Sequence, residues 1–129
     1  MTGEPVLLDT NIIVEHFRPP CKHGEAIERH RLHVPEIVVA ELYAGALRSR
    51  RPTHHRKVVD DFLESVILVP SDLGTAQFYA ELWNQLAGHG RLIPHNDIWI
   101  AALAIQHGLK LITNDKHFAC IEGLDHSGW

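Results

Sequence analysis

The fold is decided by residues 97–113, which read DIWIAALAIQHGLKLIT. The segment from Ile98 to Ile105 is apolar on every side, which predicts a helix buried inside the protein. Gly108 is suited to end that helix, because glycine adopts the left-handed conformation of a helix end without strain. The run Leu111-Ile112-Thr113 then predicts a short buried strand. A buried helix followed by a buried strand is typical of an α/β protein.

The same alternation of strands and helices recurs earlier in the chain. Short apolar runs that predict strands of a parallel sheet, covered on both faces, lie at residues 6–8, 32–34 and 66–69. Helical patterns lie at residues 35–47, with Pro35 in the first turn, at 58–66 and, after the capping pair Ser71-Asp72, at 76–86. We therefore expect an α/β fold with right-handed crossovers. The length of 129 residues predicts one domain over residues 1–129.

Composition excludes several classes of protein. Hydrophobic residues make up 45% and charged residues 22% of the chain, as in globular proteins, and no apolar run is long enough to span a membrane. Apolar residues begin at Val6, which leaves no room for a signal peptide, so we expect a cytoplasmic protein without membrane contact. Cys21 and Cys120 are too isolated to form a disulfide framework or a zinc site. The net charge of −4 does not indicate a nucleic-acid-binding protein, although local charge can differ.

Four acidic residues stand where side chains of an α/β protein meet. Asp9 and Asp115 follow the first and last predicted strands, and the carboxyl ends of parallel strands share one edge of a sheet. Asp97 lies in the first turn of the buried helix, and Glu41 lies within an apolar helix. Each acid alone is explained by helix capping or by solvation. Together they predict a cluster at one edge.

Such a cluster favours a metal centre. Two carboxylates about 4 Å apart repel each other by about 4 kcal/mol at an effective dielectric constant of 20. The cluster must therefore take up protons or cations. Oxygen ligands without a local His or Cys favour Mg²⁺ or Mn²⁺ over zinc. A carboxylate-bound metal ion is the apparatus of phosphodiester hydrolysis.

Four motifs around these acids resemble the PIN domain family, and more narrowly the VapC-type toxin ribonucleases of bacterial toxin–antitoxin pairs. The motifs occur in order along nearly the whole chain, as LLDTN at residues 7–11, AELYAGA at 40–46, DIWIAA at 97–102 and TNDKHF at 113–118. Each motif alone is weak, but four in order in a chain of this length are a strong signal. The resemblance implies a three-layer α/β/α fold with a central parallel sheet.

The resemblance also implies an activity and a site. It implies a Mg²⁺- or Mn²⁺-dependent endoribonuclease in which a metal-activated water hydrolyses RNA, leaving a 5′-phosphate, and which a cognate antitoxin inhibits. Asp9 and Asp97 match the principal metal-binding acids, and Glu41 and Asp115 complete an acidic quartet in which either could act as the base. The residues that match positions orienting these acids are Thr10, Asn11 and Thr113. A homodimer is expected from the family alone.

Several features outside the motifs allow two interpretations. The only dense basic stretch, residues 48–57, either binds RNA phosphates or forms a solvated loop between helices. Arg91 is a second candidate for a phosphate contact, but a side chain in a surface loop is the favoured interpretation. Trp83 and Trp99 are expected in the core or an interface. Trp129 is expected to be disordered or at an interface.

Two alternative functions remain open from the sequence. A catalytically inactive PIN-like module that only binds a partner would have no need of all four acids. A metal-dependent phosphatase of the haloacid-dehalogenase type requires D-x-D after the first strand, where this chain has Asp9-Thr10-Asn11. A receiver domain requires an acidic pair there, which is also missing. The ribonuclease is therefore the favoured hypothesis.

Overall fold

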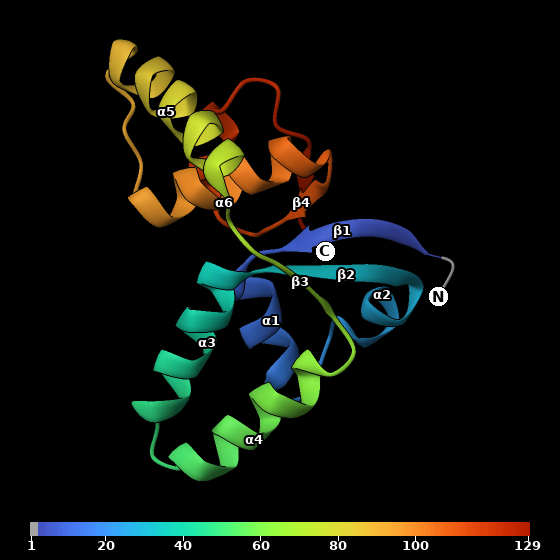
Figure 1. Cartoon of the computed structure of the whole chain (residues 1–129). Helices are drawn as coiled ribbons and strands as arrows, with labels where there is room; N and C mark the ends of the chain where they lie inside the picture. Colours follow the sequence, from blue (N-terminus) through green and yellow to red (C-terminus); the bar gives the residue numbers. More distant parts are fainter. Residues whose placement is uncertain (1–2) are drawn as a thin grey trace.

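The computed structural model describes residues 3–129 and builds them around one sheet (Figure 1). The strands are β1 (Glu4–Leu8), β2 (His30–Pro35), β3 (Ile67–Val69), β4 (Lys110–Ile112) and β5 (His126–Ser127). The helices are α1 (Thr10–Phe17), α2 (Gly24–Arg29), α3 (Glu36–Leu47), α4 (Pro52–Leu63), α5 (Leu73–Gly88) and α6 (His95–His107), with a 3₁₀ turn at Lys116–Cys120.

The sheet is parallel throughout, in the order β3-β2-β1-β4-β5. The central strand β1 pairs with β2 on one side and with β4 on the other, so that Leu7 lies opposite both His33 and Leu111. Successive strands run outward from β1 to β3, and the chain then crosses to β4. This reversal places a topological switch point at the carboxyl ends of β1 and β4, where open α/β sheets bind ligands.

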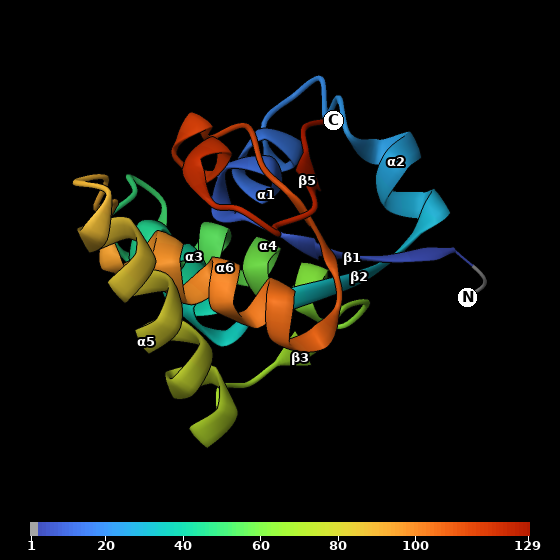
Figure 2. The same cartoon turned by 90° about the horizontal axis from the view of Figure 1, so that it is seen from above.

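Helices cover both faces of the sheet, as Figure 1 shows. Helices α5 and α6 lie side by side on one face, which the view from above in Figure 2 also shows. Helices α1 to α4 lie on the other face. The predicted three-layer α/β/α arrangement around a parallel sheet is confirmed.

The predicted buried helix and its neighbouring strand are confirmed. Ile98 and Leu103 of α6 are fully buried, as are Leu111 and Ile112 of β4. Gly108 ends α6 at φ +63°, a conformation that favours glycine. Among residues 3–129, no helix is long and apolar enough to cross a membrane.

Strand β3 corrects one expectation from the sequence. Ile67 and Leu68 are 51% and 54% exposed, and only Val69 of this strand is buried. The expectation that each strand is covered on both faces is wrong for β3, because this strand lies at the edge of the sheet.

Other differences concern short elements and boundaries. Helices α1 and α2 and strand β5 have no counterpart among the expected elements. Pro35 ends β2 and precedes α3, rather than standing in its first turn, and Val66 lies between α4 and β3. Trp129 is ordered and half-buried, with its ring centroid 5.1 Å from that of His30.

Candidate active site

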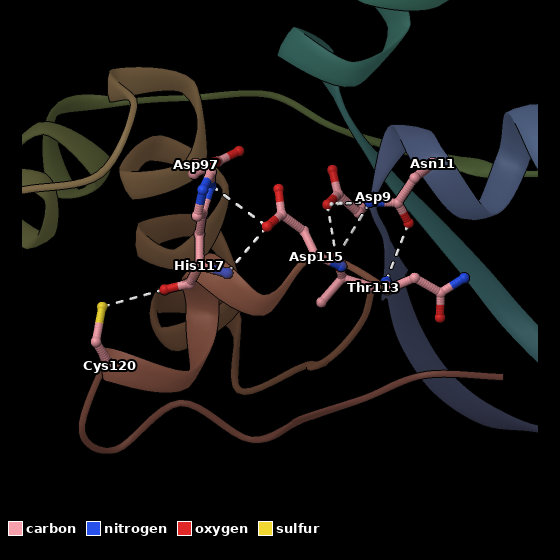
Figure 3. A network of polar contacts seen from close by, with 8 residues as sticks. Asp9, Asn11, Asp97, Thr113, Asp115, His117 and Cys120 are labelled. Carbon is pink, nitrogen blue, oxygen red and sulfur yellow. Dashed lines mark hydrogen bonds and ion pairs between the residues drawn. The ribbon is translucent and has the colours of Figure 1, made fainter.

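Asp9 lies directly after β1 and is only 5% exposed, and Figure 3 shows Asp115 between it and Asp97. The Asp9 carboxylate accepts three hydrogen bonds: from the Thr10 backbone N–H at 2.8 Å, the Thr113 hydroxyl at 2.8 Å and the Asn11 side-chain amide at 3.1 Å. The first of these bonds caps α1. Asp9 is thus both the N-cap of a helix and a member of the cluster, so the two interpretations of its sequence position hold together.

Opposing effects act on the pKa of Asp9, and the net shift is upward. Burial is the largest cause, because it disfavours the charged form, and the negative charges of Asp97 and Asp115 add to it. The hydrogen bonds from Thr113 and Thr10 lower the pKa but do not cancel the increase. The position of Asp9 therefore favours a bound proton or a nearby cation.

His117 lies between Asp97 and Asp115 and contacts both carboxylates. Asp97 lies in the first turn of α6, and Asp115 is the N-cap of the 3₁₀ turn, where it accepts the His117 backbone N–H at 2.9 Å. The Nδ1 atom of His117 lies 3.1 Å from Oδ2 of Asp97 and 3.3 Å from Oδ1 of Asp115 (Figure 3). One ligand atom from each of the three lies within 4.8 Å of the other two. The pKa of His117 is raised, first by its hydrogen bond to Asp97.

Glu41 approaches the cluster from the opposite helical layer. It projects from α3 and is half-buried, and the Thr10 hydroxyl lies 3.3 Å from its Oε2 atom as a donor. Burial is the main cause of the raised pKa of Glu41, and the charges of Asp9 and Asp97 raise it further. Hydrogen bonds from Thr10 and Asn96 act in the other direction. The structure thus brings together Asp9, Glu41, Asp97 and Asp115, as expected.

Neutral side chains tie the ends of β1 and β4 together behind the acids. Asn11 donates to Asp9, and its carbonyl oxygen accepts the Asn114 backbone N–H at 3.1 Å. The Thr113 hydroxyl accepts the Asp115 backbone N–H at 3.0 Å while donating to Asp9. These contacts hold the loop after β4 against α1, so Asp9 and Asp115 keep a defined spacing.

Two polar residues of the site were not assigned a role from the sequence. His117 lies two residues after Asp115, and only the 3₁₀ turn directs its ring toward Asp97. Asn96 directly precedes Asp97 in the first turn of α6, a spacing that carries no signal of contact with α3. Arg91, the other predicted phosphate contact, is exposed in the loop before α6.

Most of the atoms in this cluster that could coordinate a metal ion are carboxylate oxygens. Their mutual repulsion and the raised pKa values of Asp9 and Glu41 make a divalent cation a favourable addition. These ligand atoms suit a hard ion that prefers oxygen, since no thiol is among them. A cation held here would face solvent on the side of His117, whose side chain is 53% exposed.

Comparison with protein families assigns the chain to a family. The model of the PIN domain matches residues 6–124, which is nearly the whole chain. The chain belongs to the PIN domain family. The four acids of this PIN domain lie in the motifs on which the resemblance was based, and the family assignment made from those motifs is confirmed.

Relatives of this PIN domain include named VapC proteins. Ribonuclease VapC2 of Haemophilus influenzae is 32% identical over 95% of this chain and 96% of its own length. Ribonuclease VapC5 of Mycobacterium tuberculosis is 36% identical over 91% of this chain and 87% of its own. The solved structure of VapBC-1 from nontypeable Haemophilus influenzae superposes with a TM-score of 0.88 at 30% identity, covering 97% of this chain and 98% of that one.

Proposed function

We propose that this PIN domain is a metal-dependent endoribonuclease and the toxin of a VapC-type toxin–antitoxin pair. The observation that carries the proposal is the meeting of Asp9, Glu41, Asp97 and Asp115, from two strand ends and both helical layers, at the switch point of the sheet. Relatives named VapC ribonucleases, aligned over at least 90% of this chain, support the same activity.

Mg²⁺ or Mn²⁺ is the proposed cofactor. Asp9 and Asp97 would hold it, with Asp115 and Glu41 completing the negative field. When bound, such an ion polarises a phosphate and stabilises the negative charge that develops on the leaving oxygen. The hydrogen bonds from Thr113 and Asn11 to Oδ2 of Asp9 would hold that carboxylate in one orientation.

A side chain of the protein would then accept the proton of the attacking water. Glu41 and Asp115 are the two acids of the cluster that are not assigned to hold the ion, and either carboxylate could accept this proton. The raised pKa of Glu41 brings it closer to neutral pH, which improves a carboxylate as a base. Thr10, which donates to Oε2 of Glu41, would orient that group.

Partners follow from the same relatives. RNA is the proposed substrate, because the matched proteins are named ribonucleases. A cognate antitoxin is the proposed inhibitor, because the similar solved structure is a VapBC assembly. We also propose a homodimer, and a cytoplasmic site of action where cellular RNA is the target. Residues 1–129 would act as one domain.

The deciding experiment is RNA cleavage with and without metal. Wild-type protein should cleave single-stranded RNA with Mg²⁺ or Mn²⁺ and lose this activity in EDTA. Asp9→Asn and Asp97→Asn should each reduce cleavage at least about 100-fold, the scale of losing one preorganised electrostatic group. Asp125→Asn, which changes an exposed acid outside the cluster, should cleave like wild type.

Two results would contradict the proposal. Full activity in Asp9→Asn would place the chemistry elsewhere. A wild-type protein that binds RNA or a partner but never cleaves would identify an inactive binding module.

A further inference from the structure

The turn between α3 and α4 concentrates positive charge in an otherwise acidic chain. Between Glu41 and Asp60 there is no acidic residue, yet this segment carries five of the chain's 12 Lys and Arg residues. Arg48, Arg50 and Arg51 lie at the turn itself, and all three are exposed. We call these three residues the arginine turn.

The arginine turn has no carboxylate partner within residues 3–129. The neighbouring basic residues on α4 are engaged: Lys57 pairs with Asp61 at 2.9 Å, and the guanidinium of Arg56 lies 5.9 Å from the ring centroid of Tyr43. No ion pair involves Arg48, Arg50 or Arg51 in the described part of the chain. Three guanidinium groups are thus free to bind an external anion.

The turn is also held in shape. The Ser49 hydroxyl donates to the carbonyl oxygen of Ala46 at 2.7 Å and lies 2.7 Å from Nδ1 of His55. These bonds join the end of α3 to the first turn of α4. A fixed backbone lowers the entropy cost of ordering side chains around a ligand.

A groove reaches from Glu41 of the acidic cluster to Ser49 of the turn. Its volume is about 520 Å³, and its lining is mostly apolar: Val14, Phe17, Leu42, Val58 and Val59 lie beside the polar residues Glu41, Ser49, His54 and His55, and the three arginines of the turn lie outside it. Arg48 is the C-cap of α3 and follows Glu41 by seven residues, which is about 10 Å along the helix axis. That distance corresponds to about three phosphates along one strand of a stacked nucleic acid. A strand cleaved at the cluster can therefore reach the arginine turn.

We propose that the arginine turn, at the end of this groove, binds backbone phosphates of single-stranded RNA and directs the strand toward Glu41. This inference rests on the proposed ribonuclease function. The four acids of the cluster can carry more negative charge than one divalent cation offsets, so cations outside the cluster help to retain a polyanion. Guanidinium groups bind phosphate through two parallel hydrogen bonds, and they release counterions as they do so.

The test is the salt dependence of RNA binding. The measurement uses the full chain carrying Asp9→Asn, which prevents cleavage, and a fluorescent single-stranded RNA of mixed sequence. Replacing Arg48, Arg50 and Arg51 together by Gln should reduce the slope of log affinity against log salt by about 2, since each contact with a single strand contributes about 0.7. Replacing all three by Lys should retain most of the slope, because the charge is kept.

A control variant removes three positive charges near the amino ends of the strands, away from the acidic cluster. The control variant carries Arg29→Gln, Arg31→Gln and Lys110→Gln, which lie at or before the amino ends of β2 and β4. Its salt slope should equal that of the parent. Thermal unfolding of each variant verifies the fold, and if the triple Gln variant is unfolded, each single Gln variant should reduce the slope by about 0.7.

The possible outcomes distinguish failure of this inference from failure of the proposed ribonuclease function. An unchanged slope in the Gln variants, while wild-type protein cleaves RNA, overturns the inference and leaves the function intact. Loss of affinity for an acidic protein partner without any change in the RNA slope also overturns it. Wild-type protein that cleaves no RNA under any metal condition contradicts the function itself, whatever the slope.

Discussion

At the scale of single residues, opposing interactions act on the charged form of Asp9, and the proposed cation would stabilise it. Three donors stabilise its charged form, but burial and two neighbouring carboxylates oppose that form more strongly. The net increase in its pKa means that the ionised side chain destabilises the metal-free fold. This loss of stability is the expected consequence of building the proposed metal site.

The first prediction concerns stability and pH without metal. A carboxyl whose pKa is higher in the folded state than its unfolded value of 3.8 binds a proton more tightly when folded. Its contribution to stability is therefore present at low pH and is lost as the pH rises through the folded-state pKa. In EDTA, Asp9→Asn should raise the unfolding temperature at neutral pH by a few degrees, and this gain should shrink toward pH 4.

The control for that measurement is Asp125→Asn, which should unfold like wild type throughout the pH range. A difference between Asp9→Asn and wild type that does not change with pH would show that packing, rather than charge, is responsible.

The second prediction concerns His117. Its protonated ring lies beside Asp97 and Asp115 and competes with a cation for the same oxygens. Because the pKa of His117 is raised, this competition extends above the usual range of histidine. His117→Ala should bind Mn²⁺ severalfold more tightly at pH 6, because the substitution removes a positive charge that competes for the same oxygens. The difference should vanish at pH values above the pKa of His117.

Calorimetric titration with Mn²⁺ provides the measurement, and His107→Ala, at the far end of α6, is the matched control. Weaker binding by His117→Ala at every pH would instead identify His117 as a ligand of the ion.

At the scale of elements, long buried segments were predictable and short ones were not. Helix α6 and strand β4 were found because continuous apolar runs lead to burial in any α/β fold. Helix α1 was missed because a single residue, Asp9, connects it to β1, with no glycine or proline to mark a turn. Helix α2 has six residues and β5 has two, too few to show a period.

The third prediction tests the edge position of β3. Leu68→Lys should change the free energy of unfolding by no more than about 0.5 kcal/mol, since exposed positions tolerate substitution. Leu111→Ala in β4 should cost about 2–5 kcal/mol, because it removes a fully buried side chain. Urea denaturation measures both, and a large loss in Leu68→Lys would mean that another surface covers β3.

At the scale of the whole molecule, the site exists only when both helical layers are assembled. The strand-edge rule predicted that Asp9 and Asp115 lie together, because it depends on topology alone. The positions of Glu41 in an apolar helix and of Asp97 in a first turn indicate that both acids join the cluster. How each helix rotates on the sheet cannot be derived from periodicity alone. The contacts of His117 and Asn96 depend on side-chain directions, which tertiary packing determines.

The last prediction follows from that assembly: metal binding should stabilise the entire chain. A ligand that binds only the folded state adds about 2.7 kcal/mol to the free energy of unfolding at a concentration 100 times its dissociation constant. Mn²⁺ should therefore raise the unfolding temperature of wild-type protein within one cooperative transition, as a single domain over residues 1–129 requires. The variant with both Asp9→Asn and Asp97→Asn should show no shift, whereas Asp125→Asn should shift like wild type. Scanning calorimetry at increasing Mn²⁺ concentration measures both effects. Two separate transitions would contradict a single cooperative unit. A shift in the double variant would mean that Mn²⁺ binds outside the acidic cluster.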